Sequence, residues 1–148
     1  MIIKTKYLGE VEIDKEKIIS FPKGILGFHN HKEFVILDIQ KNNYFKFLQD
    51  IHNQYVAFLI INPWSFYKDY DIEVADEKLM DIKINPKEDN QIAVYNIVTL
   101  GSSLSNSTVN LLAPIVINIK DRLGKQFILD DSPYSTKHRL PIAGEDTC

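Results

Sequence analysis

The chain has 148 residues, of which 45% are hydrophobic and 25% are charged, and its formal net charge is −3 at pH 7. This length and composition exclude a disordered or low-complexity chain and predict one domain large enough to bury its own core. The slight acidic excess also excludes the overall basic field that attracts nucleic acid. We therefore expect no direct contact with nucleic acid.

The sequence shows no sign of export or membrane insertion. Its first residues lack the apolar core and cleavage site of a signal peptide, and no window of about 18 apolar residues is available to span a membrane. Cys148 is the only cysteine, so the fold does not depend on a disulfide within the chain or on an oxidising compartment. We expect a soluble, cytoplasmic protein that does not contact a membrane.

Apolar runs rich in β-branched and aromatic residues predict strands along most of the chain. Residues 2–5 and 8–13 form the first expected pair, with Gly9 near the turn. Residues 55–61 form a near-continuous apolar run, which is typical of a strand that crosses a core. Further strands are expected at residues 17–20, 34–37, 44–48, 71–74, 91–100, 108–118 and 126–129.

Helix content is expected to be low. Only residues 29–33 and 77–82 have a helical pattern, and Asp76 stands where it would cap the second helix. Short strands at regular spacing, without long helices for crossovers, predict an all-β and mainly antiparallel fold. The expected architecture is a small β-barrel or a strongly bent sandwich with one or two short helices.

The run 108–118 carries Pro114 near its middle. Proline has no N–H to donate to a sheet, so we expect this residue at an edge, at a bulge or at a bend between sheets. Together with residues 55–61, this run should be among the central elements of the fold. The domain is expected to span residues 1–140, and residues 141–148 are expected to form a loose tail because they contain few apolar side chains.

The chain offers few candidates for catalytic or metal-binding residues. The spacing of His29 and His31 would place both on one face of a strand, but no third zinc ligand is indicated, so we interpret them as loop histidines. The serine-rich residues 101–105 lack the pattern of a nucleophile elbow. The glycines at 24, 27 and 124 lack phosphate-loop spacing and are interpreted as turns that need positive φ. We predict no catalytic residue, no metal and no cofactor.

An acidic stretch and an aromatic loop adjoin each other in the sequence. Residues 69–89 contain eight acidic and three basic side chains, which indicates either a solvated face or a surface for a basic partner. The preceding loop, residues 63–70, concentrates four aromatic side chains after a buried strand. Such residues either fold back over the end of a barrel or anchor a protein interface, and we expect at least two of them to pack.

Several segments together resemble the FliW family of flagellar assembly factors. The order and spacing of these segments match the family along nearly the whole chain, and the block 110–118 followed by 124–126 is the most specific part. The segments that carry the resemblance are residues 21–28, 47–49, 58–63, 108–118 and 124–126, and Tyr134 with His138 and Arg139.

The resemblance implies a small β-barrel-like binding protein of flagellated bacteria that has no catalytic activity and is a monomer when free. It implies that the protein binds newly made flagellin in the cytoplasm. It also implies binding to the translational repressor CsrA, away from the RNA site of CsrA. Once flagellin is exported, the freed protein would bind CsrA and relieve repression of flagellin mRNA.

Two other classes of protein remain open. A small β-barrel RNA-binding module would need a basic groove lined with stacking aromatics, whereas the aromatic loop of this chain runs into acidic sequence. An unrecognised hydrolase would need convergent polar groups in a pocket.

We expect CsrA to bind a surface that combines the acidic stretch around residues 69–81 with the C-terminal segment that contains Tyr134 and His138. Flagellin is expected to bind an apolar face near the loop of Trp64. CsrA must be cationic where it holds RNA, so an acidic neighbour would weaken RNA binding by repulsion. The candidate partner-binding residues are Trp64, Phe66, Tyr67, Asp69, Asp71, Glu73, Tyr134, His138 and Arg139.

Overall fold

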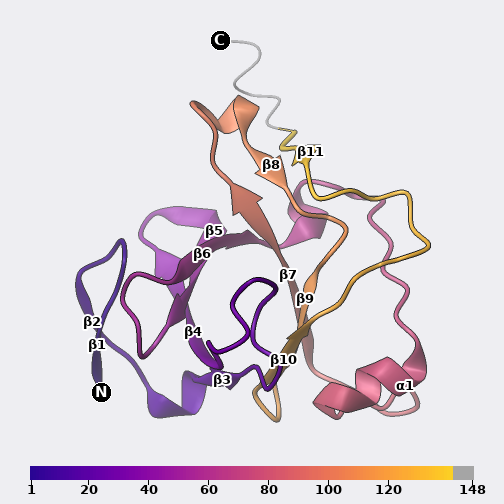
Figure 1. Cartoon of the computed structure of the whole chain (residues 1–148), viewed down its shortest axis with the longest axis horizontal. Coiled ribbons are helices and arrows are strands. Elements are labelled where there is room, and N and C mark those ends of the chain that lie inside the picture. Colours follow the sequence, from indigo (N-terminus) through magenta and orange to yellow (C-terminus); the bar gives the residue numbers. More distant parts are fainter. Residues whose placement is uncertain (142–148) are drawn as a thin grey trace.

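The computed structural model describes residues 1–141, whose regular elements are mostly strands (Figure 1). The first two strands, β1 (Ile2–Lys4) and β2 (Glu10–Glu12), form an antiparallel hairpin of their own. Gly9, just before β2, has a φ of 69°, a conformation in which a residue without a side chain is not strained. This confirms the predicted first pair and its turn.

The remaining strands form one strongly bent sheet. They pair in the order β11-β8-β7-β6-β5-β4-β3-β10-β9, and β7 also pairs with β9, so the pairings return to β7 in a closed circuit. β3 and β10 pair in parallel, whereas the other pairings in the described residues are antiparallel. The mainly antiparallel, strongly bent fold is therefore confirmed. The strands are β3 (Ile19–Ser20), β4 (Glu33–Ile39), β5 (Asn42–Asp50), β6 (Ala57–Ile61), β7 (Ile92–Thr99), β8 (Thr108–Val109), β9 (Ile115–Asn118), β10 (Leu123–Gln126) and β11 (His138–Arg139).

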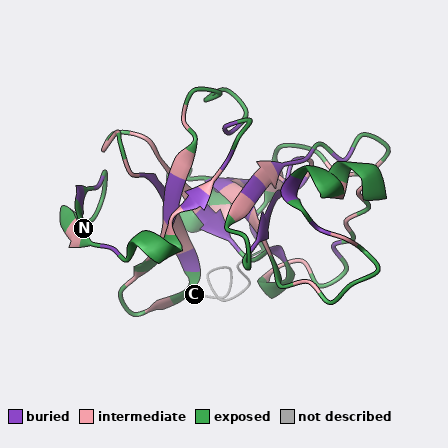
Figure 2. Ribbon diagram, turned by 90° about the horizontal axis from the view of Figure 1, so that it is seen from below, coloured by how far each residue is buried: buried purple, intermediate pink, exposed green. Residues whose placement is uncertain are grey.

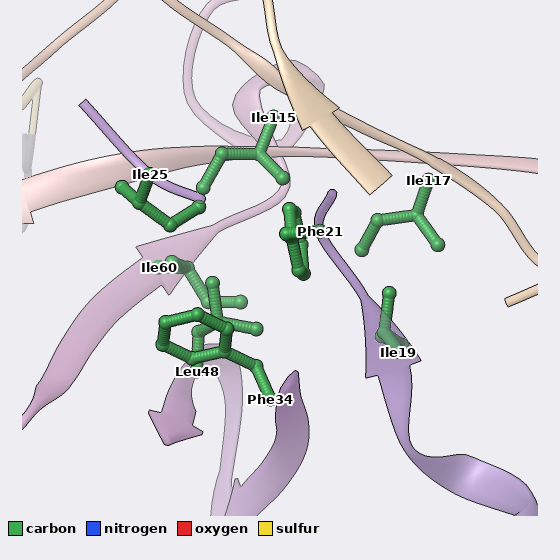
Figure 3. Packing of buried hydrophobic residues seen from close by; sticks show 8 residues of the cluster. All are labelled: Ile19, Phe21, Ile25, Phe34, Leu48, Ile60, Ile115 and Ile117. Atoms are coloured by element: carbon green, nitrogen blue, oxygen red, sulfur yellow. The ribbon is translucent and has the colours of Figure 1, made fainter. Parts of the chain in front are cut away.

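The inside of the bend holds the principal core (Figure 3). Phe21 and Phe34 meet there edge to face, with ring centroids 5.4 Å apart, and neither ring is exposed to solvent. Buried residues gather in the middle of the sheet, whereas α1 and most of the connecting loops are exposed (Figure 2). The inner cluster consists of Ile19, Phe21, Ile25, Phe34, Leu48, Ile60, Ile115 and Ile117.

Glycines serve two different purposes around this core. Gly24 and Gly27 have φ values of 67° and 84°, as the prediction of positive-φ turns requires. Gly124 does not lie in such a turn but in β10, so that part of the prediction was wrong. A Cβ atom at Gly124 would stand 2.4 Å from Cε2 of Phe21. Glycine is therefore needed at 124 for close packing rather than for backbone freedom.

Two predicted elements were wrong. Residues 29–33 form no helix, because five residues without a supporting surface cannot repay helix nucleation, and Glu33 instead begins β4. Residues 71–74 alternate as a strand would, with Ile72 and Val74 half-buried, but they pair with no strand of the described chain. Ile72 packs against a second hydrophobic cluster, which contains Tyr70, and Val74 packs against this cluster and a third one, which contains Phe127. The segment therefore covers the sheet instead of extending one of its edges.

The run 108–118 is divided into two strands. β8 ends at Val109 and β9 begins at Ile115, with a bend at residues 112–113. Pro114 lies between this bend and β9, which confirms the predicted location at a bend. Inside the connection the Asn110 side chain accepts a hydrogen bond from the N–H of Ala113 at 3.0 Å. Within the described chain β6 and β9 each pair on both sides, as expected of central strands.

Other boundaries also differ from the prediction. Tyr55 lies in a turn and is 73% exposed, so the apolar run 55–61 becomes a strand only from Ala57. β10 begins three residues earlier than the predicted strand 126–129. The apolar side chains that follow it nevertheless continue the pairing, because the N–H groups of Phe127 and Leu129 donate to the carbonyls of residues 114 and 112.

The second predicted helix is confirmed as α1 (Asp76–Leu79), which continues into the 3-10 turn η3 (Met80–Ile82). Its N-cap is Ala75 rather than Asp76, and no side chain caps it. Further 3-10 turns are η1 (Lys15–Lys17), η2 (Pro63–Ser65) and η4 (Leu104–Asn106). Within residues 1–141 none of these helices has the length and apolarity needed to cross a membrane. The expected tail, residues 141–148, lies outside the described residues except for Pro141.

Candidate functional site

The aromatic loop follows β6 and is closed by its own hydrogen bonds. The Asn62 side chain accepts a hydrogen bond from the N–H of Trp64 at 3.0 Å and thereby caps η2. The indole Nε1 of Trp64 donates to the carbonyl of Tyr70 at 2.8 Å, while 40% of this residue stays exposed. The loop therefore presents Trp64 to solvent in a defined orientation.

Tyr70 anchors the same loop inside the molecule. It is 5% exposed, its Oη donates to the carbonyl of Leu111 at 2.6 Å, and it accepts a hydrogen bond from Nδ2 of Asn96 at 3.2 Å. Burial raises the pKa of Tyr70 to about 12. Phe66 and Tyr67 are half-buried against the hydrophobic cluster that contains Tyr70. The prediction that at least two aromatics of this loop pack is therefore confirmed.

The C-terminal segment packs directly on the aromatic loop. The Oη of Tyr67 donates to the carbonyl of Arg139 at 2.6 Å, and the N–H of Asp71 donates to the Oη of Tyr134 at 2.9 Å. The ring of Tyr134 lies 4.7 Å from that of Tyr70, centroid to centroid. His138, in β11, lies edge-on between the rings of Tyr67 and Tyr134. The structure thus brings together two segments about 70 residues apart in the sequence.

The nine candidate residues named above therefore lie on two contacting segments, and we call them the acidic-aromatic face. Asp69, Asp71 and Glu73 are exposed, because the alternation along this segment turns Ile72 inward and the carboxylates outward. These three carboxylates form no ion pair with any residue of the described chain. Their negative charge is therefore available to a basic partner.

Asp81, at the far end of the acidic stretch, is used differently. Its carboxylate accepts a hydrogen bond from Nζ of Lys125 at 2.6 Å, and this contact lowers the pKa of Asp81. Part of the acidic stretch is thus tied to β10, while the part near the aromatic loop is left for solvent or a partner.

Sequence reasoning missed Tyr44, which extends the exposed aromatic surface. Tyr44 is 58% exposed, and its ring lies 5.5 Å from that of Phe66, centroid to centroid. The alternation of residues 44–48 indicated that Tyr44 and Phe45 face opposite sides of a strand. It did not indicate that the outward side adjoins the aromatic loop.

An acidic groove lies beside the face and is lined by the segments 71–75 and 127–134. It encloses about 780 Å³. The second of these segments contributes carboxylates that sequence reasoning also missed; two adjacent aspartates after an apolar run were the available signal. Lys78 is the basic side chain of the lining, and its other members include Asp71, Ile72, Glu73, Val74, Phe127, Ile128, Leu129, Asp130 and Asp131.

The two histidines considered as metal ligands have separate partners. His31 Nδ1 lies 2.5 Å from Oδ2 of Asp50, and His29 Nδ1 lies 3.5 Å from the carbonyl of Lys23. Asp50 is buried and also accepts N–H groups from the following turn. Within residues 1–141 no three histidine, cysteine or carboxylate side chains converge as metal ligands. The His31–Asp50 contact joins the segment just before β4 to the end of β5.

Comparison with known proteins places this chain and its bent sheet in the class of flagellar assembly factors. A family model described as FliW protein matches residues 2–140. A flagellar assembly factor FliW from Oceanobacillus iheyensis is 44% identical over 137 residues, covering 93% of this chain and 92% of the relative. The FliW of Clostridium kluyveri is 41% identical over 148 residues, with 100% of both chains covered.

A solved structure of a flagellar assembly factor has the same fold as this chain. The crystal structure of a flagellar assembly factor FliW matches with a TM-score of 0.86 and 39% identity, covering 95% of this chain and 96% of that one. The FliW of Bacillus subtilis is 40% identical over 145 residues, covering 98% of this chain and 99% of the relative. The chain belongs to the FliW family, as its sequence motifs predicted.

Proposed function

We propose that this flagellar assembly factor is a cytoplasmic, non-enzymatic binding protein with two alternative partners, flagellin and CsrA. While flagellin is abundant it occupies the protein. When flagellin has been exported, the free monomer binds CsrA and relieves repression of flagellin mRNA. Family membership and the names of the relatives support the flagellar role, and the acidic-aromatic face supports the choice of partners.

The observation that carries the CsrA assignment is the contact between the acidic segment 69–73 and the C-terminal segment. The carboxylates of this acidic segment form no ion pair in the described chain. A repressor that holds RNA must carry cations at its RNA site. Asp69, Asp71 and Glu73 would attract such a surface and raise the rate of association. Once docked beside the RNA site, the same carboxylates would repel the phosphates of RNA without occupying that site.

The flagellin assignment is supported by the exposed aromatic side chains. Trp64 and Tyr44 are both exposed, and the ring of Tyr44 lies beside the half-buried Phe66 of the same loop as Trp64. Exposed tryptophan and tyrosine are favoured anchors of protein interfaces because they bury a large apolar area. These anchors adjoin the acidic segment, so two large partners on this face would overlap. A coupling of a few kcal/mol is enough for a partner switch.

A competition experiment tests this proposal. CsrA is titrated into the purified full chain by calorimetry, with and without saturating flagellin. We expect each partner alone to bind and flagellin to weaken the apparent CsrA affinity at least about tenfold. A ternary complex with unchanged affinities would contradict the switch. Trp64→Ala should weaken flagellin binding, whereas the matched control Tyr55→Ala, at an exposed turn between β5 and β6, should not.

The RNA-binding alternative is less well supported. A second groove, of about 700 Å³, is lined by Lys17, Lys46, Lys120 and Arg122, but among its described residues the one aromatic side chain is Tyr95, which is half-buried. Glu16 and Asp38 also line this groove. Binding of single strands needs several aromatic faces along a cationic groove.

A further inference from the structure

The acidic groove has a wall whose backbone is extended but unpaired. In the segment 71–75, the main-chain groups of Ile72, Glu73 and Val74 form no hydrogen bond with any residue from 1 to 141. The side chains of this segment alternate as in a strand, with the apolar ones packed inward. Its backbone N–H and C=O groups are therefore left for water or for a ligand.

The opposite wall is the open edge of a strand-like segment. Beyond β10, the N–H of Phe127 donates to the carbonyl of Pro114 at 3.0 Å, and the N–H of Leu129 donates to that of Leu112 at 2.8 Å. Alternate residues of an antiparallel ladder direct their main-chain groups to opposite sides. The N–H of Ile128 accordingly points away from this pairing and donates to no other described residue, whereas its carbonyl, on the same side, accepts the N–H of Asp130 at 3.1 Å. The free group of this edge is therefore the N–H of Ile128.

An open edge of this kind is a template for another strand. Main-chain hydrogen bonds would provide affinity, and the side chains beside the edge would determine which sequence is preferred. Among its described residues the groove combines apolar side chains with the carboxylates of Asp71, Glu73, Asp130 and Asp131 and one cation, Lys78. Its charge therefore favours lysine or arginine in the added segment.

We propose that the groove binds an extended, basic segment of a protein partner by strand addition to the edge at Ile128. The segment alternates apolar side chains, which contact the floor, with cationic ones, which meet the carboxylates of the two walls. This inference rests on the proposed function for the identity of the basic partner. The backbone geometry and the charge of the groove are independent of it.

The first test uses a synthetic six-residue peptide of alternating lysine and valine, blocked at both ends. It is titrated into the full chain and followed by NMR at the Ile128 amide. Strand addition predicts a shift and slower hydrogen exchange of that amide. It also predicts at least about tenfold weaker binding when the peptide N–H groups that face the edge are N-methylated. Two peptides, methylated at odd or at even positions, cover both orientations, and only one should lose affinity. A glutamate–valine peptide is the charge control.

The second test changes the edge itself. Ile128→Pro removes the free N–H without breaking an internal hydrogen bond, and the residue before it is already extended. We expect this variant to bind the lysine–valine peptide about tenfold more weakly, while the matched control Ile128→Val binds within about twofold. Equal binding of the parent peptide and both methylated peptides, or no change at the Ile128 amide, would overturn the proposal even if the proline variant did not fold.

Titration with full-length CsrA separates this inference from the proposed function. If CsrA binds the wild-type chain but binds Ile128→Pro equally well, strand addition is wrong and the partner assignment stands. If CsrA does not bind the wild-type chain, the proposed function is wrong. The peptide experiments then decide about the groove alone.

Discussion

The inner core and the acidic-aromatic face both depend on aromatic side chains, but in different ways. In the core, Phe21 and Phe34 are enclosed by strands whose backbones are paired in the sheet. On the acidic-aromatic face, Tyr67 and Tyr134 use the hydroxyl to join two segments, and the buried Tyr70 beside Tyr134 anchors the aromatic loop in the same way. The comparison shows how a protein can order irregular segments without pairing their backbones. The unpaired groups then remain available for recognition.

The largest expected effect concerns the core side of this comparison. Gly124→Ala should lower the free energy of unfolding by about 3 kcal/mol, because the added methyl group meets the ring of Phe21 inside a packed sheet. The measurement is chemical denaturation. Gly9→Ala is the control: a Cβ there has open space, so only the left-handed backbone costs about 1 kcal/mol.

A double mutant makes this prediction sharper. If the contact with Phe21 causes the loss, Phe21→Leu combined with Gly124→Ala should be more stable than the sum of the two single changes predicts. Additive losses would show that the requirement for glycine has another origin.

In the aromatic loop beside the face, Tyr70→Phe should lower the free energy of unfolding by about 1–3 kcal/mol. The substitution leaves the buried carbonyl of Leu111 without its donor, while the ring stays in place. Tyr67→Phe removes a more exposed hydrogen bond and should cost about 1 kcal/mol. Thermal denaturation of both variants gives the comparison, and a larger loss for Tyr67→Phe would contradict the assigned anchor.

The pH dependence of the free energy of unfolding should also show the contribution of Tyr70. Burial raises the pKa of Tyr70 and of Tyr67 from 10.0 to about 12. Since the folded state holds these protons more tightly, their contribution is fully present below pH 10 and is lost as the pH rises from 10 to 12. Denaturation midpoints measured across this range should fall less steeply in Tyr70→Phe than in the wild type. Identical slopes would show that Tyr70 ionises as freely as an exposed tyrosine.

The sequence predicted the paired part of the molecule better than the unpaired part. Alternation and β-branched runs predicted the positions of β6 and β7, because the side chains of these strands pack on the same sheet in which their backbones are paired. The same alternation at residues 71–74 was misleading, since it records which side chains are buried and not what the backbone pairs with. The role of Gly124 and the groove formed with Asp130 and Asp131 depend on contacts between segments distant in the chain. No local pattern encodes such contacts.

The most direct test of the central claim is the rate at which CsrA associates with a chain whose acidic-aromatic face has been reversed in charge. Asp69→Lys, Asp71→Lys and Glu73→Lys are combined in one variant, and Glu10→Lys, Glu12→Lys and Glu16→Lys form the control. Both variants change the net charge equally through exposed side chains without ion pairs in the described chain.

Association is measured by stopped flow over a range of salt concentrations, and affinity by calorimetry. The account predicts that the face variant associates with CsrA at least about tenfold more slowly and with a weaker dependence on salt. The control should lose much less, and flagellin affinity should stay nearly unchanged in the face variant. Equal CsrA association rates and affinities for the wild type and the face variant would contradict the claim that this face binds CsrA.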